Sequence, residues 1–274
     1  MKITDEFIKE LKDTTLNIRK NILEEVYSAQ SGHPGGALSI AEIMTALYFC
    51  EMNIDPAKPN DENRDRLVLS KGHASAALYA ALAERGFFPK EELKNFRKIG
   101  SFLQGHPDMK KIPGVDMTSG SLGQGLSAAN GMALSSKLDK KGFRVYCIVG
   151  DGEIQEGQIW EAAMTASHYK LDNLCLIVDN NNLQIDGKVS DVMSVYPLEE
   201  KFESFGFNVI SIDGNNIEEV IGALKDARVT KDKPTAIIAK TVKGKGVSFM
   251  ENQAGWHGKA PKEEEYNRAM EELK

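Results

Sequence analysis

The sequence predicts an α/β fold with a central, mostly parallel sheet and helices on both of its faces. Two short apolar runs, residues 143–149 and the run that ends at Asp179, flank a segment with helical spacing, which is the pattern of a β-α-β unit. A second strand, helix and strand pattern follows over residues 207–242. Crossover helices return the chain to the same side of a sheet, so we expect these strands to pair in parallel.

The N-terminal part shows two helical patterns. Apolar residues at near-helical spacing predict a long amphipathic helix over the first 30 residues, which ends at Ser31. Ser39 and Glu42 have the form of a capping box, in which each residue satisfies a free backbone group of the other. We therefore expect a second helix from Ser39 towards Met52.

The remaining elements follow from composition and from the positions of glycine and proline. An alanine-rich segment ends at Gly86, and a long glycine-rich stretch with little periodicity comes after it. In chain order, the expected elements are a loop over 55–65, a strand over 66–70, a helix over 73–85, a loop over 100–124, a helix over 127–136, a strand over 207–212, a helix over 217–228, a strand over 235–242, and a loop over 243–260 before a charged helix that runs to residue 274. We expect a single domain over residues 1–274.

Composition and charge restrict the class of protein. Of the 274 residues, 41% are hydrophobic and 27% are charged, which is ordinary for a soluble globular protein. The net charge of -6 argues against a nucleic-acid partner. No apolar run reaches the roughly 20 residues that span a bilayer, and residues 1–20 have no signal-peptide core. We therefore expect a cytoplasmic protein with no membrane contact.

The three cysteines predict neither a disulfide framework nor a metal cluster. Cys147 and Cys175 lie within strand-like apolar runs, and Cys50 lies at the end of the second predicted helix. The simplest interpretation is three free thiols, of which the two in the strands are buried.

Polar residues follow the two neighbouring strands of the first β-α-β unit. Gly150, Asp151 and Gly152 come directly after one strand, and Asn181 comes just after the other. The carboxyl ends of adjacent parallel strands lie side by side, where open α/β sheets bind ligands. A carboxylate and an amide at that edge suit a hard cation such as Mg²⁺, and glycine lets the backbone approach a phosphate closely. A lone Gly-Asp-Gly is a common turn, but Asn181 with the following residues 183–187 favours a diphosphate-and-metal site.

Histidines form a second candidate cluster. Four of the five histidines adjoin a glycine in predicted loops or at element ends, namely His33, His73, His106 and His257. One loop histidine is usually a solvated or packing residue, but four together indicate an imidazole-lined pocket that moves protons near neutral pH. His168 falls in the last turn of the crossover helix, where a cation complements the helix dipole, and we interpret it as structural.

The motifs described above, together with several others, resemble those of transketolases in their order along the chain, and the resemblance covers nearly its whole length. The matching segments are residues 31–35 (SGHPG), 70–74 (SKGHA), 105–107 (GHP), 120–125 (GSLGQG), 150–152 with Asn181, 155–157 (QEG) and 257–258 (HG). Several independent motifs in one order are more specific than any single one.

The resemblance implies a thiamine diphosphate binding domain of the diphosphate-binding type, with Mg²⁺ as the metal and Ca²⁺ as the alternative. The implied metal ligands are the Asp151 carboxylate, the Asn181 side chain and the Leu183 backbone carbonyl. Cofactor contacts carried over from the family are as follows: Gly150, Asp151, Gly152 and His73 at or near the diphosphate, Gly120 and Leu122 at the aminopyrimidine, Ile185 against the rings, Asn181 through the metal, and His257 over the thiazolium.

Catalytic roles are implied for the same four histidines. His33 and His257 would assist proton transfer over the thiazolium, His106 would contact the terminal hydroxyl of the donor, and His73 would lie near the reacting carbons. Glu156 and Glu161 match acids of a glutamate network that links paired active sites, although each alone is typical of a helix-surface charge. Two positions depart from many transketolases: Ser121 stands in place of proline and Lys71 in place of asparagine.

The chain corresponds to the first domain of a transketolase. The resemblance therefore implies a separate C-terminal subunit with the pyrimidine-binding and C-terminal domains, an α2β2 assembly, and sugar phosphate substrates whose phosphate site lies on that subunit. Residues 120–131 are the candidate contact surface.

Three alternatives remain open at this point. The first two are a 1-deoxyxylulose-phosphate synthase-like protein and a 2-oxoacid dehydrogenase alpha-like protein, against which the segments 155–157 and 31–35 favour transketolase. The third is a non-catalytic thiamine diphosphate binding module, since one domain holds half of such a site.

Overall fold

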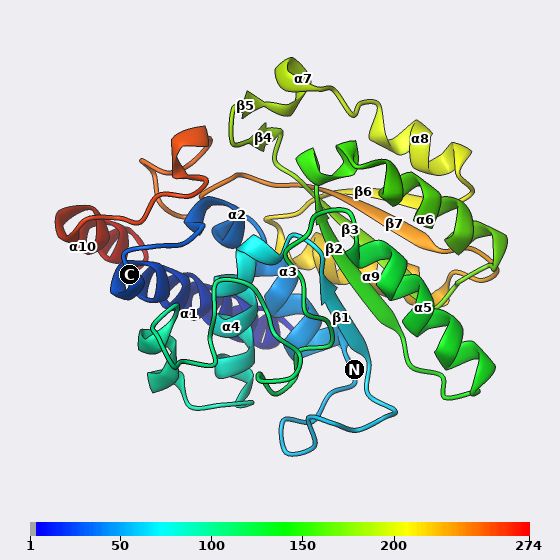
Figure 1. Ribbon diagram of the computed structural model, residues 1–274, viewed down its shortest axis with the longest axis horizontal. Helices are drawn as coiled ribbons and strands as arrows, with labels where there is room; N and C mark the ends of the chain where they lie inside the picture. The colour runs from blue at the N-terminus through cyan, green and yellow to red at the C-terminus, as the bar shows by residue number, and fades with distance from the viewer. Residues whose placement is uncertain (1–3) are drawn as a thin grey trace.

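A five-stranded parallel sheet forms the centre of the computed structural model, which describes residues 4–274 (Figure 1). Its strand order is β1-β2-β3-β7-β6, and every neighbouring pair is parallel. The strands are β1 (Arg66–Leu69), β2 (Val145–Gly150), β3 (Leu174–Asn180), β6 (Asn208–Asp213) and β7 (Thr235–Lys240). The predicted parallel α/β architecture is confirmed.

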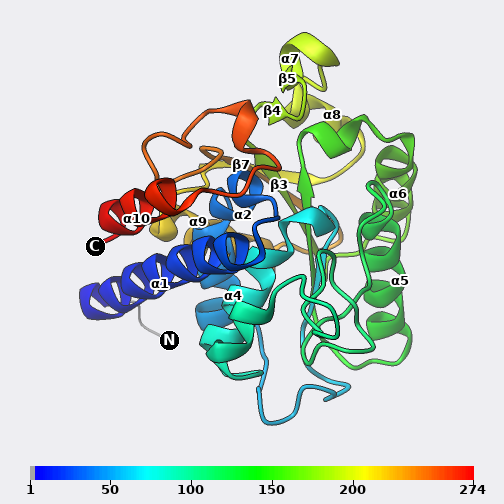
Figure 2. The same cartoon turned by 60° about the vertical axis from the view of Figure 1, so that its left-hand side comes forward.

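Helices cover both faces of this sheet, with α1 (Asp5–Ala29) and α4 (Ser75–Arg85) on one side and α5 (Gly125–Leu138) and α6 (Gly157–His168) on the other (Figure 2). Side chains of β2 alternate between the two layers, because successive residues of a strand point to opposite faces. Tyr146 and Ile148 belong to the buried cluster with α1 and α4, whereas Cys147 belongs to the cluster with α5 and α6. Buried strands of this kind read as continuous apolar runs.

Shorter elements complete the chain. They are α2 (Pro34–Leu38), α3 (Ala41–Ala46), the π-helical turn η1 (Leu47–Glu51), α7 (Val189–Val192), α8 (Leu198–Ser204), α9 (Ile217–Val229), α10 (Glu263–Glu272), the short hairpin strands β4 (Leu183–Gln184) and β5 (Gly187–Lys188), and the 3-10 turns η2 (Gly72–Ala74), η3 (Lys90–Asn95), η4 (Gly152–Gln155) and η5 (Ala254–Trp256). The hairpin and α7 project beyond the carboxyl edge of the sheet (Figure 2).

The predicted long first helix is confirmed over α1, where Thr4 accepts a hydrogen bond from the Phe7 backbone N–H at 3.2 Å as the N-cap; residues 1–3 lie outside the described residues. The predicted loop over 100–124 is also confirmed, since it contains no helix or strand. All three cysteines are free, and Cys147 and Cys175 are buried as expected. Among the described residues, no helix combines the length and apolar character needed to cross a membrane.

The predicted capping box at Ser39 is wrong. The Ser39 hydroxyl donates to the carboxylate of Asp179 at 2.7 Å and to the Gly36 carbonyl at 3.1 Å, and the N-cap of α3 is Ile40, not Ser39. The expected single helix from Ser39 is divided into α3 and η1, and Ile40 precedes α3 without a side-chain cap. The Ser39 hydroxyl instead donates a hydrogen bond to a buried carboxylate that lies 140 positions away in the sequence.

The strand register brings the predicted site together. Gly150 pairs with Asp179, and Asn180 pairs with Lys240, so β2, β3 and β7 end at one edge. The end of β1 lies beside β2 and is followed by the turn η2. The polar residues that follow all four strands are thereby placed around one region.

Candidate active site

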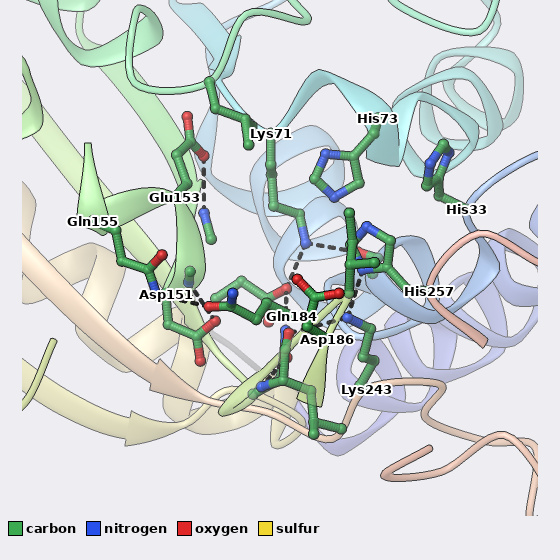
Figure 3. A pocket seen from close by; sticks show the side chains of 18 of the residues that line it. His33, Lys71, His73, Asp151, Glu153, Gln155, Gln184, Asp186, Lys243 and His257 are labelled. Carbon is green, nitrogen blue, oxygen red and sulfur yellow. Dashed lines mark hydrogen bonds and ion pairs between the residues drawn. The ribbon is translucent and has the colours of Figure 1, made fainter. Parts of the chain in front are cut away.

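A cavity of about 350 Å³ lies at this carboxyl edge of the sheet (Figure 3). Three of the predicted histidines and the ends of several strands line it. The predicted site residues that line it are His33, His73, Gly120, Leu122, Gly150, Asp151, Gly152, Glu156, Asn181, Leu183, Ile185 and His257. The fold therefore gathers residues from six separate motifs into one place.

Two predicted residues do not line the cavity. His106 is exposed, and its ring packs on Gly120, where an added Cβ would lie 3.0 Å from a ring carbon. Glu161 is exposed on α6. Glu156 reaches the cavity wall but is also exposed, and His168 lies at the end of α6, as expected of a structural residue.

Asp151 is 2% exposed and faces the cavity. One carboxylate oxygen accepts the backbone N–H of Gly152 at 2.8 Å, and the other accepts the backbone N–H of Asn182. Burial, and then the nearby charge of Asp179, raise the pKa of Asp151 to about 7. A cation beside this carboxylate would offset both effects, because opposite charge favours the ionised form.

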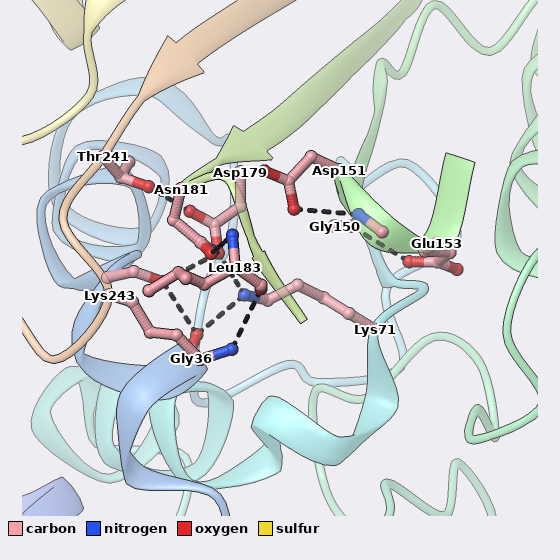
Figure 4. Close-up of polar contacts among 12 residues, drawn as sticks. Gly36, Lys71, Gly150, Asp151, Glu153, Asp179, Asn181, Leu183, Thr241 and Lys243 are labelled. Carbon is pink, nitrogen blue, oxygen red and sulfur yellow. Dashed lines mark hydrogen bonds and ion pairs between the residues drawn. The ribbon is translucent and has the colours of Figure 1, made fainter. Parts of the chain in front are cut away.

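Asp179 lies deeper, at the end of β3, and is fully buried. Its carboxylate accepts hydrogen bonds from the Lys71 ammonium at 2.5 Å, from Ser39, from the Asn181 amide at 3.0 Å and from the Thr241 hydroxyl (Figure 4). Burial alone would raise the pKa of Asp179, but the charge of Lys71 and these hydrogen bonds outweigh it and hold the pKa below its usual value.

Two buried lysines were not predicted as site residues. Lys71 follows β1 by two positions and also donates to the Gly36 carbonyl at 2.7 Å. Lys243, beyond β7, lies 3.0 Å from the Leu183 carbonyl and 2.8 Å from Nδ1 of His257. Burial, and then the charge of Lys71, lower the pKa of Lys243 to about 8. Two ammonium groups in one cavity make it suited to an anion.

Both lysines carry a sequence signal that the prediction did not use. Each follows a strand that pairs within the same parallel sheet as β2, so each is bound to lie at the edge that holds Asp151. On sequence alone, Lys71 stands out only as a departure from the transketolase pattern.

Glu153 was also missed. It is 4% exposed, and its carboxylate accepts the Gly123 N–H at 2.9 Å, the Gly150 N–H at 3.0 Å and the Ser70 hydroxyl. Burial raises the pKa of Glu153 despite these hydrogen bonds. One carboxylate thus connects the end of β2, the residue after β1 and the 100–124 loop.

Three histidine rings form a cluster opposite Asp151 (Figure 3). The ring centres of His33, His73 and His257 lie 5.1 to 5.5 Å apart. Burial, and then Arg97, lower the pKa of His33 to about 4, while burial, and then Lys243, lower that of His257 to about 3. Burial and then Lys71 hold the pKa of His73 well below its usual value. All three rings are therefore neutral near pH 7.

The donor set fits a hard divalent cation. The Asp151 carboxylate, the Asn181 amide oxygen and the Leu183 carbonyl are oxygen ligands at one edge. Within residues 4–274 no group of three or more histidine, cysteine or acidic side chains is arranged to hold a metal, so a cation here would use amide and carbonyl oxygens beside one carboxylate. In this structure the Leu183 carbonyl accepts Lys243, and the Asn181 amide oxygen accepts the Leu183 N–H at 3.1 Å.

Two glycines of the cavity wall pack closely against polar side chains. An added Cβ at Gly36 would lie 3.5 Å from the Lys71 ammonium, and one at Gly152 would lie 3.2 Å from the Gln184 side chain. The two buried ammonium groups and the oxygen ligands at this edge fit a phosphorylated, metal-bound cofactor.

Comparisons with known proteins agree with this geometry. The family model described as "Transketolase, thiamine diphosphate binding domain" matches residues 12–273. The chain is 49% identical to a 6-deoxy-6-sulfo-D-fructose transketolase subunit from Clostridium sp. (strain MSTE9), with 93% of each chain covered. It is 44% identical to an apulose-4-phosphate transketolase subunit from Phocaeicola vulgatus, and the match covers 93% of this chain and 90% of that one.

Among solved structures, a transketolase from Campylobacter jejuni superposes with a TM-score of 0.91 at 38% identity. The alignment covers 100% of this chain and 43% of that one. This chain therefore spans less than half of that larger protein.

Proposed function

The chain belongs to the transketolase family, and we propose that it is the N-terminal, thiamine diphosphate binding subunit of a two-subunit transketolase. Its reaction transfers a two-carbon ketol unit from a ketose to an aldose, with sugar phosphates or related anionic sugars as substrates. Two relatives of nearly the same length, each named as a subunit, support the division into two chains. The sequence identity of this chain to these two transketolase subunits also favours transketolase over other thiamine enzymes.

One observation carries the proposal: buried Asp151, Lys71 and Lys243 meet at one sheet edge beside three neutral histidines. Asp151, Asn181 and the Leu183 carbonyl would hold Mg²⁺, for which Ca²⁺ is the alternative. Lys243 and the Gly152 backbone would bind the diphosphate, and Gly150 allows close approach. Thiamine diphosphate supplies the electron sink for breaking the carbon–carbon bond.

The chain's own residues have positioning roles. Gly120 and Leu122 would contact the aminopyrimidine, and Ile185 the cofactor rings. His33, His73 and His257 would hydrogen-bond the sugar oxygens in the cavity, while His106 at its edge would contact the donor's terminal hydroxyl. Neutral imidazoles suit this work because each ring nitrogen either donates or accepts.

The partner is a C-terminal subunit, in an α2β2 assembly. Ile185 is 70% exposed and Leu122 is 38% exposed at the cavity wall. These two apolar side chains, which are assigned to the cofactor, are therefore only partly covered by the described residues. A second chain closing over them would bury them. Glu156 and Glu161 are exposed, as an acid network between active sites requires before assembly.

Turnover tests the proposal. The chain is assayed alone and with its candidate C-terminal subunit, in thiamine diphosphate and Mg²⁺, against xylulose 5-phosphate, 6-deoxy-6-sulfofructose and apulose 4-phosphate as donors and ribose 5-phosphate as acceptor. We expect ketol transfer only in the mixture, and loss of it with Asp151→Ala in place of the wild-type chain. Cofactor binding without transfer for any donor would favour a non-catalytic module.

A further inference from the structure

Arg97 contacts the first histidine of the cluster from outside the cavity. Its backbone follows η3 with a φ of 59°, and its N–H donates to the Leu103 carbonyl at 2.7 Å. One guanidinium nitrogen donates to the Ser31 hydroxyl at 3.0 Å, and another lies 3.3 Å from Nδ1 of His33. The guanidinium also lies over the Phe96 ring at 5.3 Å. These contacts hold the group against one edge of the imidazole.

The donor and the acceptor of this contact follow from the chemistry of the two groups. A guanidinium is always charged in proteins, and its nitrogens donate but never accept. Nδ1 of His33 must therefore be the acceptor, which leaves the ring proton on Nε2. We propose that Arg97 is a positioning residue that holds His33 as the neutral Nε2–H tautomer.

The charges around His33 favour the same state. Among residues 4–274, the titratable groups that face it are Arg97, His106 on the 100–124 loop, His73 on η2, His257 after η5, and Lys243 after β7, and none of these is an acid. Burial, then Arg97, His106 and Lys243, lower the pKa of His33 to about 4. A positive charge on the ring, beside that of Arg97, is therefore disfavoured at neutral pH.

The protonated nitrogen faces the cavity side. An added Cβ at Gly258 would lie 3.5 Å from both Cδ2 and Nε2 of His33, so this edge points towards the segment that carries His257. Within residues 4–274 the ring's hydrogen bond is the one at Nδ1. Nε2–H is free to donate to a ligand oxygen.

The tautomer of His33 limits its role in the reaction, a consequence that rests on the proposed function. In this tautomer His33 donates a hydrogen bond to a sugar carbonyl or alkoxide oxygen and does not remove a proton through Nε2. Neutral histidine acts in this way as an electrophile in other enzymes. The base for the hydroxyl proton of the donor must then be another group.

Nitrogen-15 NMR of the histidine side chains tests the tautomer. Spectra are recorded on the full chain without cofactor, with His33→Asn identifying the resonances of His33. We expect the proton on Nε2 and no titration of this ring between about pH 5 and pH 8. A proton on Nδ1, or a ring that titrates near its ordinary value, would overturn the proposal.

Two substitutions test whether the donor at position 97 determines the tautomer of His33. Arg97→Met removes every donor, so we expect a mixture of tautomers and a rise in the pKa of His33, whereas Arg97→Lys keeps a cationic donor and preserves the wild-type spectrum. If Arg97→Met does not fold, Arg97→Leu makes the same comparison, because its side chain likewise has no donor. A wild-type spectrum in both the methionine and leucine variants, or in whichever of them folds, would contradict the assignment.

Activity provides an independent readout. In the assembled enzyme, we expect Arg97→Met to lower kcat about 10- to 100-fold with little change in affinity for thiamine diphosphate. Unchanged kcat together with an altered tautomer would overturn the catalytic consequence. The NMR result is obtained without a partner, so it stands or fails separately from the proposed transketolase activity.

Discussion

Asp151 follows β2 and Asp179 lies at the end of the adjacent β3, and their pKa values move in opposite directions. The difference lies in their partners. Asp179 has the Lys71 ammonium at 2.5 Å and three further donors, whereas Asp151 accepts from two backbone N–H groups and, within the described residues, contacts no lysine. The negative charge of Asp179 is thus balanced by Lys71 within the fold, whereas the Asp151 carboxylate has no cation beside it among the described residues.

This contrast predicts the effect of removing the Asp151 carboxylate. Asp151→Ala should abolish Mg²⁺-dependent binding of thiamine diphosphate, because it removes the one anionic metal ligand. Calorimetric titration of the variant measures the affinity. His168→Ala is the matched control and should bind normally, since His168 lies at the far end of α6. Near-normal affinity in Asp151→Ala would refute the metal assignment.

Glu153 supplies a second prediction at this scale. Glu153→Gln replaces one accepting oxygen with a donating NH₂ group that must face the donors of Ser70, Gly123 or Gly150. We expect the free energy of unfolding to fall by about 1–3 kcal/mol, the cost of a buried donor left unpaired. Urea denaturation measures it.

Glu161→Gln is the matched control for this change, because Glu161 is exposed on α6. Its free energy of unfolding should stay within about 0.5 kcal/mol of the wild type. Equal stability of the two glutamine variants would mean that Glu153 does not connect the loops.

Helix α1 contains a buried acid that has no hydrogen-bond partner among residues 4–274. Glu25 is fully buried, and neither carboxylate oxygen has a hydrogen-bond partner within the described chain. Burial, and then Glu24, raise the pKa of Glu25 well above its usual 4.5. Burial therefore favours the neutral form of Glu25.

The raised pKa of Glu25 should make the folded protein less stable as pH rises. A raised folded-state pKa gives stability that is present below the unfolded pKa and is lost as pH rises towards the folded one. Relative to Glu25→Gln, the wild type should lose at most about 1.4 kcal/mol per pH unit above pH ~4.5. Unfolding free energies of both proteins between about pH 5 and pH 9 measure this loss. Parallel pH profiles would show that Glu25 ionises freely.

Strong patterns made most elements predictable. The apolar runs of β2, β3 and β7 are long enough to identify buried strands, and α1 has a clear helical period. The β4–β5 hairpin was not predicted, because strands of two residues carry no period. The Ser39 cap failed because helix-cap residues also serve as hydrogen-bond donors to distant groups.

The site was predictable where a motif or strand end identified it. Asp151, Asn181 and the histidines followed from that reasoning together with the resemblance, and the structure brings all of them except His106 and the structural His168 to the cavity. Lys71 and Lys243 were missed because isolated lysines are typical of a solvated surface, and only tertiary packing reveals their burial. The tautomer of His33 depends on a contact 64 positions away.

At the scale of the whole molecule, the cavity combines a buried polar end with an exposed apolar wall. Asp151 and Lys243 are 2% exposed, whereas Ile185 is 70% exposed. A ligand held at the polar end would leave its apolar part near solvent in this chain alone. Closure by a second subunit would exclude that solvent and strengthen the electrostatic contacts within.

Cofactor affinity with and without the partner is the most direct test of this account. Thiamine diphosphate is titrated calorimetrically into the chain alone and into its mixture with the C-terminal subunit, each in Mg²⁺ and in EDTA. We predict the tightest binding in the mixture with Mg²⁺, and at least a tenfold loss, about 1.4 kcal/mol, when either the partner or the metal is removed. Equal affinity in all four conditions would contradict a metal-dependent site that a second subunit completes.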